Sequence, residues 1–166
     1  QSKYGQSKRD GELAVLNSGA RVYLVRTCRL FGKSGVGAHV KKSFVDLMLE
    51  LGQNREFVEV VDAELASPTY SLDLARQTRR LLDENFPSGI YHITNFGQCT
   101  WFTFAQEIFR LWQELHSQAH LANLQRVTAQ AFPRPAPRPQ YSVLINTKLP
   151  PLRSWQEALK EYLQSK

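Results

Sequence analysis

The feature that most constrains the fold is the alternation of helix-like and strand-like patterns along the 166-residue chain. Segments 40–52 and 100–115 place apolar residues three and four positions apart, as an amphipathic helix does. Between such segments lie short stretches that read as strands, at 20–32, 56–65 and 88–97. This alternation is typical of an α/β protein whose parallel strands are connected by helices.

The individual segments give more specific expectations. Residues 20–32 form a nearly continuous apolar run, which predicts one strand buried on both faces of a parallel sheet. Helices are expected over 4–16, 67–86 and 154–165, the last with Ser154 as its cap and Glu157 completing a capping box. A short strand is expected within 124–132. Residues 133–145 should be extended, because each proline disfavours a helical conformation in the residue before it.

Charge and composition disfavour several classes of protein. The net charge is +6, but the basic residues are scattered and not interleaved with aromatic ones, which argues against a nucleic-acid site. No apolar run approaches the roughly 20 residues that cross a bilayer, so no membrane association is expected. Cys28 and Cys99 could form a disulfide, but two reduced, buried thiols in a cytoplasmic protein are the favoured interpretation. No complete set of metal ligands is found, because His116 and His120 have no Glu or Cys beside them.

Tyr4 and Lys8 are the residues whose spacing points to chemistry. At i and i+4 of a helix they share one face, with their Cβ atoms about 5–6 Å apart. A tyrosine ordinarily has a pKa of about 10, and a neighbouring ammonium lowers that value by favouring the phenolate. Such a pair can deliver a proton to a carbonyl oxygen while hydride reaches its carbon. The spacing is also common by chance, so it does not establish a site alone.

Several motifs, taken in order, resemble one enzyme family. The run "YGQSKRDGE" followed by "VYLVRTCRLFG" is similar to the Tyr-Lys motif region of the dTDP-4-dehydrorhamnose reductases, which are extended short-chain dehydrogenases. The likeness continues through "SFVDLMLELG", "SPTYSLDLA", "GIYHITNFGQCTWFTFAQEIF", "RPQYSVL" and "SWQEALKEYL". Each motif is modest, but their shared order and spacing make the resemblance specific.

The resemblance implies a fold and a division of the chain. The expected fold is α/β, the C-terminal part of an NAD(P)-binding, Rossmann-like extended short-chain dehydrogenase. It would comprise the remaining parallel strands and a small α/β substrate-binding lobe. Residues 1–32 would be the tail of the Rossmann domain, with the Tyr-Lys helix and the strand after it. Residues 33–166 would mainly form the lobe, with 70–95 returning to the Rossmann sheet.

The resemblance also implies roles for individual residues. Tyr4 would donate the proton to the C4 keto oxygen of dTDP-4-dehydro-L-rhamnose, giving dTDP-L-rhamnose. Lys8 would bind the nicotinamide ribose of NADPH or NADH and tune Tyr4. Thr27 and Cys28 would lie beside the nicotinamide. The substrate-binding residues implied by the family are Arg29, Ser67, Thr69, Arg138 and Ser142. For Arg138 there is an independent argument, because a guanidinium suits a diphosphate.

The sequence departs from the family in three ways. Arg29 stands where the family has a tryptophan, and Ala66 where it has a loop glycine, both in the substrate region. The glycine-rich fingerprint that binds the cofactor pyrophosphate is not found. The chain is therefore expected to correspond to the C-terminal part of the enzyme. By itself it should neither bind NADPH tightly nor turn over substrate.

These departures leave alternatives open. One is a sugar-nucleotide epimerase or dehydratase of the same superfamily, and another is a non-catalytic, reductase-like regulatory subunit. The sequence does not decide between NADPH and NADH. The resemblance allows a homodimer and a divalent ion such as Mg²⁺, although Glu12 alone is no evidence for a metal site. The expected partner is a dTDP-sugar, and the expected location is the cytoplasm.

Overall fold

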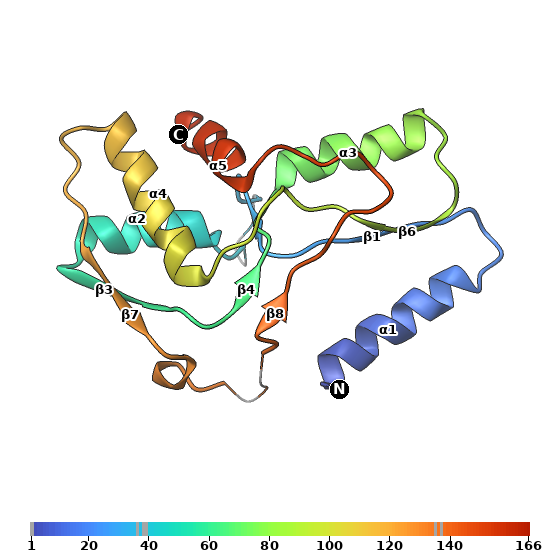
Figure 1. Ribbon diagram of the computed structural model, residues 1–166, viewed down its shortest axis with the longest axis horizontal. Helices are drawn as coiled ribbons and strands as arrows, with labels where there is room; N and C mark the ends of the chain where they lie inside the picture. The colour runs from blue at the N-terminus through green and yellow to red at the C-terminus, as the bar shows by residue number, and fades with distance from the viewer. Residues whose placement is uncertain (1, 36, 38–39, 135, 137) are drawn as a thin grey trace.

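The computed structural model describes residues 2–35, 37, 40–134, 136 and 138–166, and it is an α/β structure (Figure 1). The helices are α1 (Lys3–Leu16), α2 (Phe44–Asn54), α3 (Ser71–Asp83), α4 (Trp101–Leu115), the 3₁₀ turn η1 (Ala129–Ala131) and α5 (Trp155–Gln164). The strands are β1 (Tyr23–Arg26), β2 (Leu30–Phe31), β3 (Phe57–Val61), β4 (Leu65–Ala66), β5 (Thr69–Tyr70), β6 (Gly89–His92), β7 (Asn123–Val127) and β8 (Tyr141–Ser142). Among these residues, no helix is long and apolar enough to cross a membrane.

The strands pair in parallel, as the alternating pattern predicts. The pairs are β1 with β6, β2 with β5, β3 with β7 and β4 with β8. In the β1–β6 pair, Tyr23 lies opposite Gly89 and Arg26 opposite His92. A short antiparallel bridge between Ala66 and Cys99 links β4 to the segment before α4. The α/β fold with parallel strands is thus confirmed.

The main apolar core lies where α2, α4 and α5 pack together and against β3 and β7; these five elements are called the lobe below. Phe104 is at its centre, only 1% exposed. Its ring lies 5.5 to 5.6 Å from the rings of Phe31, Phe44 and Trp155. A smaller core, centred on Leu81 and Tyr91, fills the space between α3 and the β1–β6 pair. The lobe therefore has an aromatic interior of its own.

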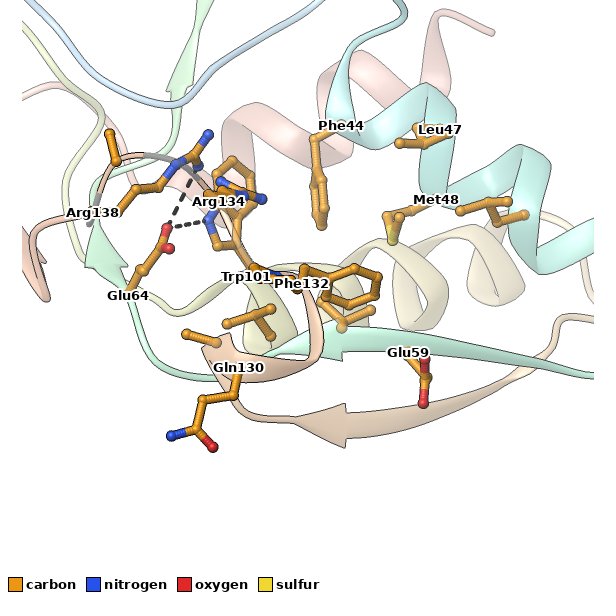
Figure 2. A pocket seen from close by; sticks show the side chains of 16 residues that line it. Phe44, Leu47, Met48, Glu59, Glu64, Trp101, Gln130, Phe132, Arg134 and Arg138 are labelled. Atoms are coloured by element: carbon orange, nitrogen blue, oxygen red, sulfur yellow. Dashed lines mark hydrogen bonds and ion pairs between the residues drawn. The ribbon is translucent and has the colours of Figure 1, made fainter. Parts of the chain in front are cut away.

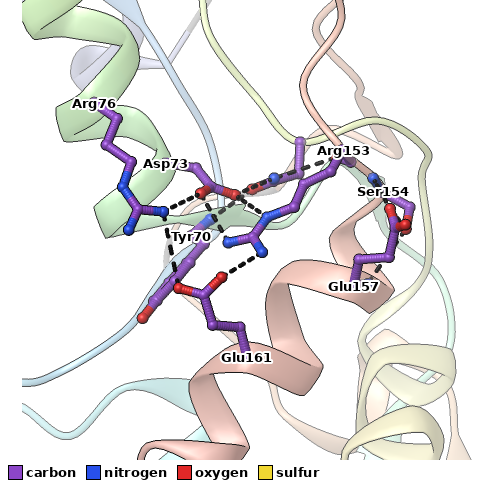
Figure 3. A network of polar contacts seen from close by, with 8 residues as sticks. Tyr70, Asp73, Arg76, Arg153, Ser154, Glu157 and Glu161 are labelled. Atoms are coloured by element: carbon purple, nitrogen blue, oxygen red, sulfur yellow. Dashed lines mark hydrogen bonds and ion pairs between the residues drawn. The ribbon is translucent and has the colours of Figure 1, made fainter.

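An ion-pair network around the buried Asp73 holds α3 against α5 (Figure 3). Asp73 of α3 is 6% exposed, and both of its oxygens accept hydrogen bonds of 2.8 Å from Arg153. Arg153 also pairs with Glu161 of α5. Asn95 donates to Asp73 at 2.8 Å and accepts from the Tyr70 backbone at 2.8 Å. The network thus links three segments that are distant in sequence.

Helix α1 differs from the other α-helices, because none of its residues is buried. Figure 1 shows it set apart from the other helices, beside the β1 strand that follows it. Ser2 caps its first turn by accepting from the Gly5 backbone at 3.1 Å. Its side-chain link to the strands is Glu12, which accepts from Arg26 Nε at 2.8 Å and from a terminal guanidinium nitrogen at 2.5 Å.

One strand expectation was wrong. The run 20–32 is not one strand buried on both faces but two short strands, β1 and β2, and the residues of β1 are only half-buried. Arg29 interrupts them with a φ of +44°, a left-handed conformation that a strand cannot include. The apolar run gave no sign of this turn, which lets the Arg29 side chain reach backbone carbonyls.

Other boundaries also shift. The expected helix over 67–86 begins only at Ser71, because Thr69 and Tyr70 form β5. The segment 56–65 divides into β3 and the start of β4. The capping box of α5 is confirmed, with Ser154 accepting from the Glu157 backbone and Glu157 accepting from that of Ser154. Strand β7 confirms the short strand expected within 124–132.

Candidate active site

Tyr4 and Lys8 lie on an exposed face of α1. The Lys8 ammonium nitrogen is 5.5 Å from the centre of the Tyr4 ring, and Tyr4 is 72% exposed. Glu12 is one further helical turn along the same face, at i+8 from Tyr4. A cavity of about 470 Å³ opens at this face; it is lined by Ser2, Gly5, Lys8, Arg9, Glu12 and Arg26. Lys8 therefore borders an open space with mostly polar and charged walls, whereas Tyr4 is exposed but not among the residues that line it.

Thr27 and Cys28 follow the carboxyl end of β1. Within the described residues, the hydroxyl of Thr27 is buried and has no hydrogen-bond partner. The Cys28 thiol donates to the Ser67 carbonyl at 3.1 Å, and burial raises its pKa. Burial also raises the pKa of Cys99, to about 12. Both cysteines are free thiols, as expected, but only Cys99 is buried, because Cys28 is of intermediate exposure.

Arg29 is held by protein groups. Its guanidinium donates to the Cys99 carbonyl at 2.6 Å and to the Glu64 carbonyl. It also stacks over the Trp101 ring, with 4.2 Å between the guanidinium carbon and the ring centre. Burial lowers the pKa of Arg29, but arginine begins high enough to stay charged. The structure therefore uses this side chain to join β4 to the start of α4.

Ser67, Thr69 and Ser142 gather around Arg29 and β4. Ser67 is 2% exposed and Thr69 is fully buried. The Thr69 backbone donates to the Arg29 carbonyl at 3.1 Å. Ser142 is half-buried in β8, opposite Ala66 of β4. The structure thus brings four of the substrate-binding candidates, Arg29, Ser67, Thr69 and Ser142, to one place, beside the cofactor candidate Cys28.

A second, larger cavity of about 700 Å³ lies between α2, β3 and the segment after β7 (Figure 2). Phe44, Trp101 and Phe132 give it aromatic walls. Glu64 accepts from the Trp101 indole nitrogen at 2.9 Å, and its carboxylate lies 3.6 Å from Arg138. Arg138 is therefore at the edge of an aromatic cavity and exposed.

Sequence reasoning missed the walls of this cavity. Phe44 and Trp101 stand in motifs that carried the family resemblance, but they were interpreted as helix-forming apolar residues. No sequence pattern identified Glu64 or Phe132 as part of a binding site, because they line a cavity with α2 only in the folded chain. In the described part of the chain, no hydrogen bond or ion pair joins Tyr4 or Lys8 to these groups, and no cluster of three metal-ligating side chains occurs.

The site chemistry can be read from these groups together. Tyr4 and Lys8 combine a hydroxyl donor with a cation, which suits proton delivery to a developing alkoxide. Aromatic walls suit a planar base, and an arginine at the rim suits a diphosphate. Comparison with known proteins decides the family. The RmlD substrate binding domain model matches residues 1–166. The chain belongs to this family.

Relatives of this domain are named as sugar-nucleotide reductases. The chain is 40% identical to a dTDP-4-dehydrorhamnose reductase of Streptomyces griseus, over 95% of this chain and 52% of that protein. It is 39% identical to a probable dTDP-4,6-dihydroxy-2-methyloxan-3-one 4-ketoreductase of Streptomyces antibioticus, over 96% and 52%. The chain therefore spans about half the length of the curated relatives it matches.

Solved structures give the same result for this RmlD-type domain. A dTDP-4-dehydrorhamnose reductase of Bacillus anthracis, in complex with NADP, superposes with a TM-score of 0.85 at 32% identity. The superposition covers 98% of this chain and 55% of that one. The fold expected from the motifs, that of an extended short-chain dehydrogenase, is confirmed.

Proposed function

We propose that this chain supplies the Tyr-Lys helix and the sugar-nucleotide lobe of an NAD(P)H-dependent dTDP-4-dehydrorhamnose reductase. The observation that carries the proposal is the placement of Lys8 beside the Tyr4 ring on an exposed helix face. It occurs in a chain that matches the family over its full length. In the division proposed, residues 1–32 and 70–95 belong to the Rossmann sheet, which the pairing of β1 with β6 supports.

The cofactor would be held by residues that the structure leaves unpaired. The Thr27 hydroxyl is buried without a partner, and within the described chain Lys8 makes no ion pair, so both suit the nicotinamide ribose and its neighbourhood. When bound, NAD(P)H supplies hydride to the C4 carbon. Tyr4 would donate its hydroxyl proton to the C4 oxygen, and the Lys8 ammonium would stabilise the phenolate left behind.

The sugar nucleotide would extend from Tyr4 toward the larger cavity. A volume of about 700 Å³ is in the range of small-molecule sites. Phe44, Trp101 and Phe132 would contact the base, and Arg138 would bind the diphosphate. The wall between Tyr4 and the larger cavity would be formed by Ser67, Thr69 and Ser142, near Cys28. Arg29 would act on substrate through Trp101, because its own donors are engaged by carbonyls.

We also propose a cellular location and an oligomeric state. A cytoplasmic location fits a biosynthetic reductase, and a homodimer is proposed from the family resemblance. Mg²⁺ is given no role here, since it rested on the family resemblance alone.

The test is turnover by the full-length gene product with dTDP-4-dehydro-L-rhamnose and NADPH. Tyr4→Phe should lower kcat roughly a hundredfold or more, because the proton donor is lost. Tyr23→Phe is a matched control: its hydroxyl donates only to the Phe86 carbonyl, at 2.8 Å, so turnover should be retained. Wild-type turnover by Tyr4→Phe would refute the mechanism. Product analysis against UDP-hexoses would reveal an epimerase or dehydratase instead.

A further inference from the structure

The ion pair between Glu12 and Arg26 lies beside the catalytic pair but takes no part in the chemistry proposed above. Tyr4, Lys8 and Glu12 occupy successive turns of one face of α1. Lys8 and Glu12 are thus i and i+4 neighbours of opposite charge, which on a helix surface ordinarily attract each other. Lys8, Glu12 and Arg26 all line the same cavity of about 470 Å³.

The observed pairing is a different one. Both carboxylate oxygens of Glu12 are taken by Arg26, at 2.8 and 2.5 Å, in a two-pronged contact. In the described structure Lys8 lies against the Tyr4 ring instead, at 5.5 Å from its centre. A planar guanidinium binds a carboxylate more specifically than a flexible ammonium does, so Arg26 is the stronger competitor for Glu12.

We propose that Arg26 is a positioning residue, which binds Glu12 so that Glu12 does not pair with Lys8. Its effect on catalysis rests on the proposed function, since it keeps the Lys8 ammonium available to Tyr4 and to the cofactor ribose. The other basic side chains near this pair are Arg9, which lines the same cavity from α1, and His92, which is opposite Arg26 in the β1–β6 pair. Neither offers Lys8 an anionic partner, so Glu12 is the competitor that Arg26 must hold.

Two substitutions distinguish a positioning role of Arg26 from a purely structural one. In the full-length gene product, Arg26→Gln frees Glu12 to draw Lys8 away, so kcat/KM should fall about fivefold, the scale of one partly exposed ion pair. The KM for NADPH should rise with it. Adding Glu12→Gln removes the competing carboxylate, so the double variant should recover most of the loss. If the pair were only a tether between α1 and β1, the double variant would be no better than Arg26→Gln.

Two further variants control for folding. Arg21→Gln removes another arginine near β1, one that donates to the Asn85 side chain and the Phe86 carbonyl, and it should leave turnover within about twofold. Arg26→Lys keeps a cation beside Glu12 and should lose less than Arg26→Gln. If Arg26→Gln itself unfolds, the exchange of both charges, Glu12→Arg with Arg26→Glu, keeps the tether and should retain turnover.

A structural readout separates this proposal from the proposed function. A crystal structure of the Arg26→Gln variant should show the Lys8 ammonium within 4 Å of Glu12, which is the ordinary limit of an ion pair. If that pair forms but the wild-type protein reduces no keto-sugar nucleotide, the proposed function fails and the competition stands. If the wild-type protein is active but Lys8 stays beside Tyr4 in the variant, the positioning role of Arg26 is overturned.

Discussion

Helix α1 and the lobe are held in place by different forces. The lobe has a continuous apolar core, with Phe104, Ile108 and Leu159 at most 1% exposed. On α1 no residue is buried, and among the described residues a cap and one ion pair hold it. The residues proposed to carry the chemistry, Tyr4 and Lys8, are thus on a helix with no buried residue, whereas several residues that line the proposed nucleotide cavity lie on the well-packed helices α2 and α4. A binding surface can be rigid before the catalytic helix is fixed.

The largest effect is expected from a substitution that creates a cavity in the apolar core of the lobe. Phe104→Ala removes a ring that contacts three others, so the free energy of unfolding should fall by about 3–5 kcal/mol. Leu13→Ala on α1, where Leu13 is 45% exposed, should change it by less than about 0.5 kcal/mol. Chemical denaturation measures both. A loss above about 1 kcal/mol for Leu13→Ala would mean that another surface covers α1.

The second test concerns the network between α3 and α5. Arg153→Met leaves the carboxylate of Asp73 buried without its two-pronged partner, and the expected loss is about 2–3 kcal/mol. The matched control is Arg79→Met, which removes an exposed pair with Asp83 on the same helix. That change should cost at most about 0.5 kcal/mol. Equal losses in the two variants would show that the network contributes no more than a surface ion pair.

The smallest effect is a pH dependence at α1. The hydrogen bond from Arg26 holds the pKa of Glu12 below its ordinary value of 4.5. Because folding lowers the pKa of Glu12, its ion pair with Arg26 stabilises α1 fully when the pH is above the ordinary pKa of 4.5. This stabilisation is lost as the pH falls through the lowered pKa of Glu12 in the folded state. Amide hydrogen exchange in α1, compared between wild type and Glu12→Gln at each pH, should differ near pH 7 and converge once the pH falls below the lowered pKa of Glu12. A difference that persists in acid would assign the link to something other than charge.

The sequence predicted the elements with local signals. The spacing of apolar residues predicted α2 and α4, and Ser154 with Glu157 predicted the start of α5, because caps and amphipathic faces depend on nearby residues. Tyr4 and Lys8 were found in the same way, since a helix alone makes them neighbours. The roles of Tyr4 and Lys8 stay predictions, as do those of the substrate-binding candidates.

What the sequence could not show depends on distant contacts. Arg29 breaks the strand because carbonyls of Cys99 and Glu64 become available to it, and these are 70 and 35 residues away. The partner of Asp73 is Arg153, 80 residues along the chain. The aromatic cavity likewise needs Phe132 to meet Phe44. The spacing of apolar residues cannot predict such pairings, because it depends only on residues within one segment.

The parallel ladders have a consequence for how the chain folds. Every ladder joins segments far apart: Tyr23 pairs with Gly89, Phe57 with Asn123 and Leu65 with Tyr141. Each pairing must close a loop of dozens of residues before its hydrogen bonds compensate for the lost chain entropy. Such non-local topology is associated with slow folding, in milliseconds to seconds rather than microseconds. Until the ladders close, a chain whose helices α2 and α4 have not yet packed together exposes their apolar faces, and such exposure favours aggregation.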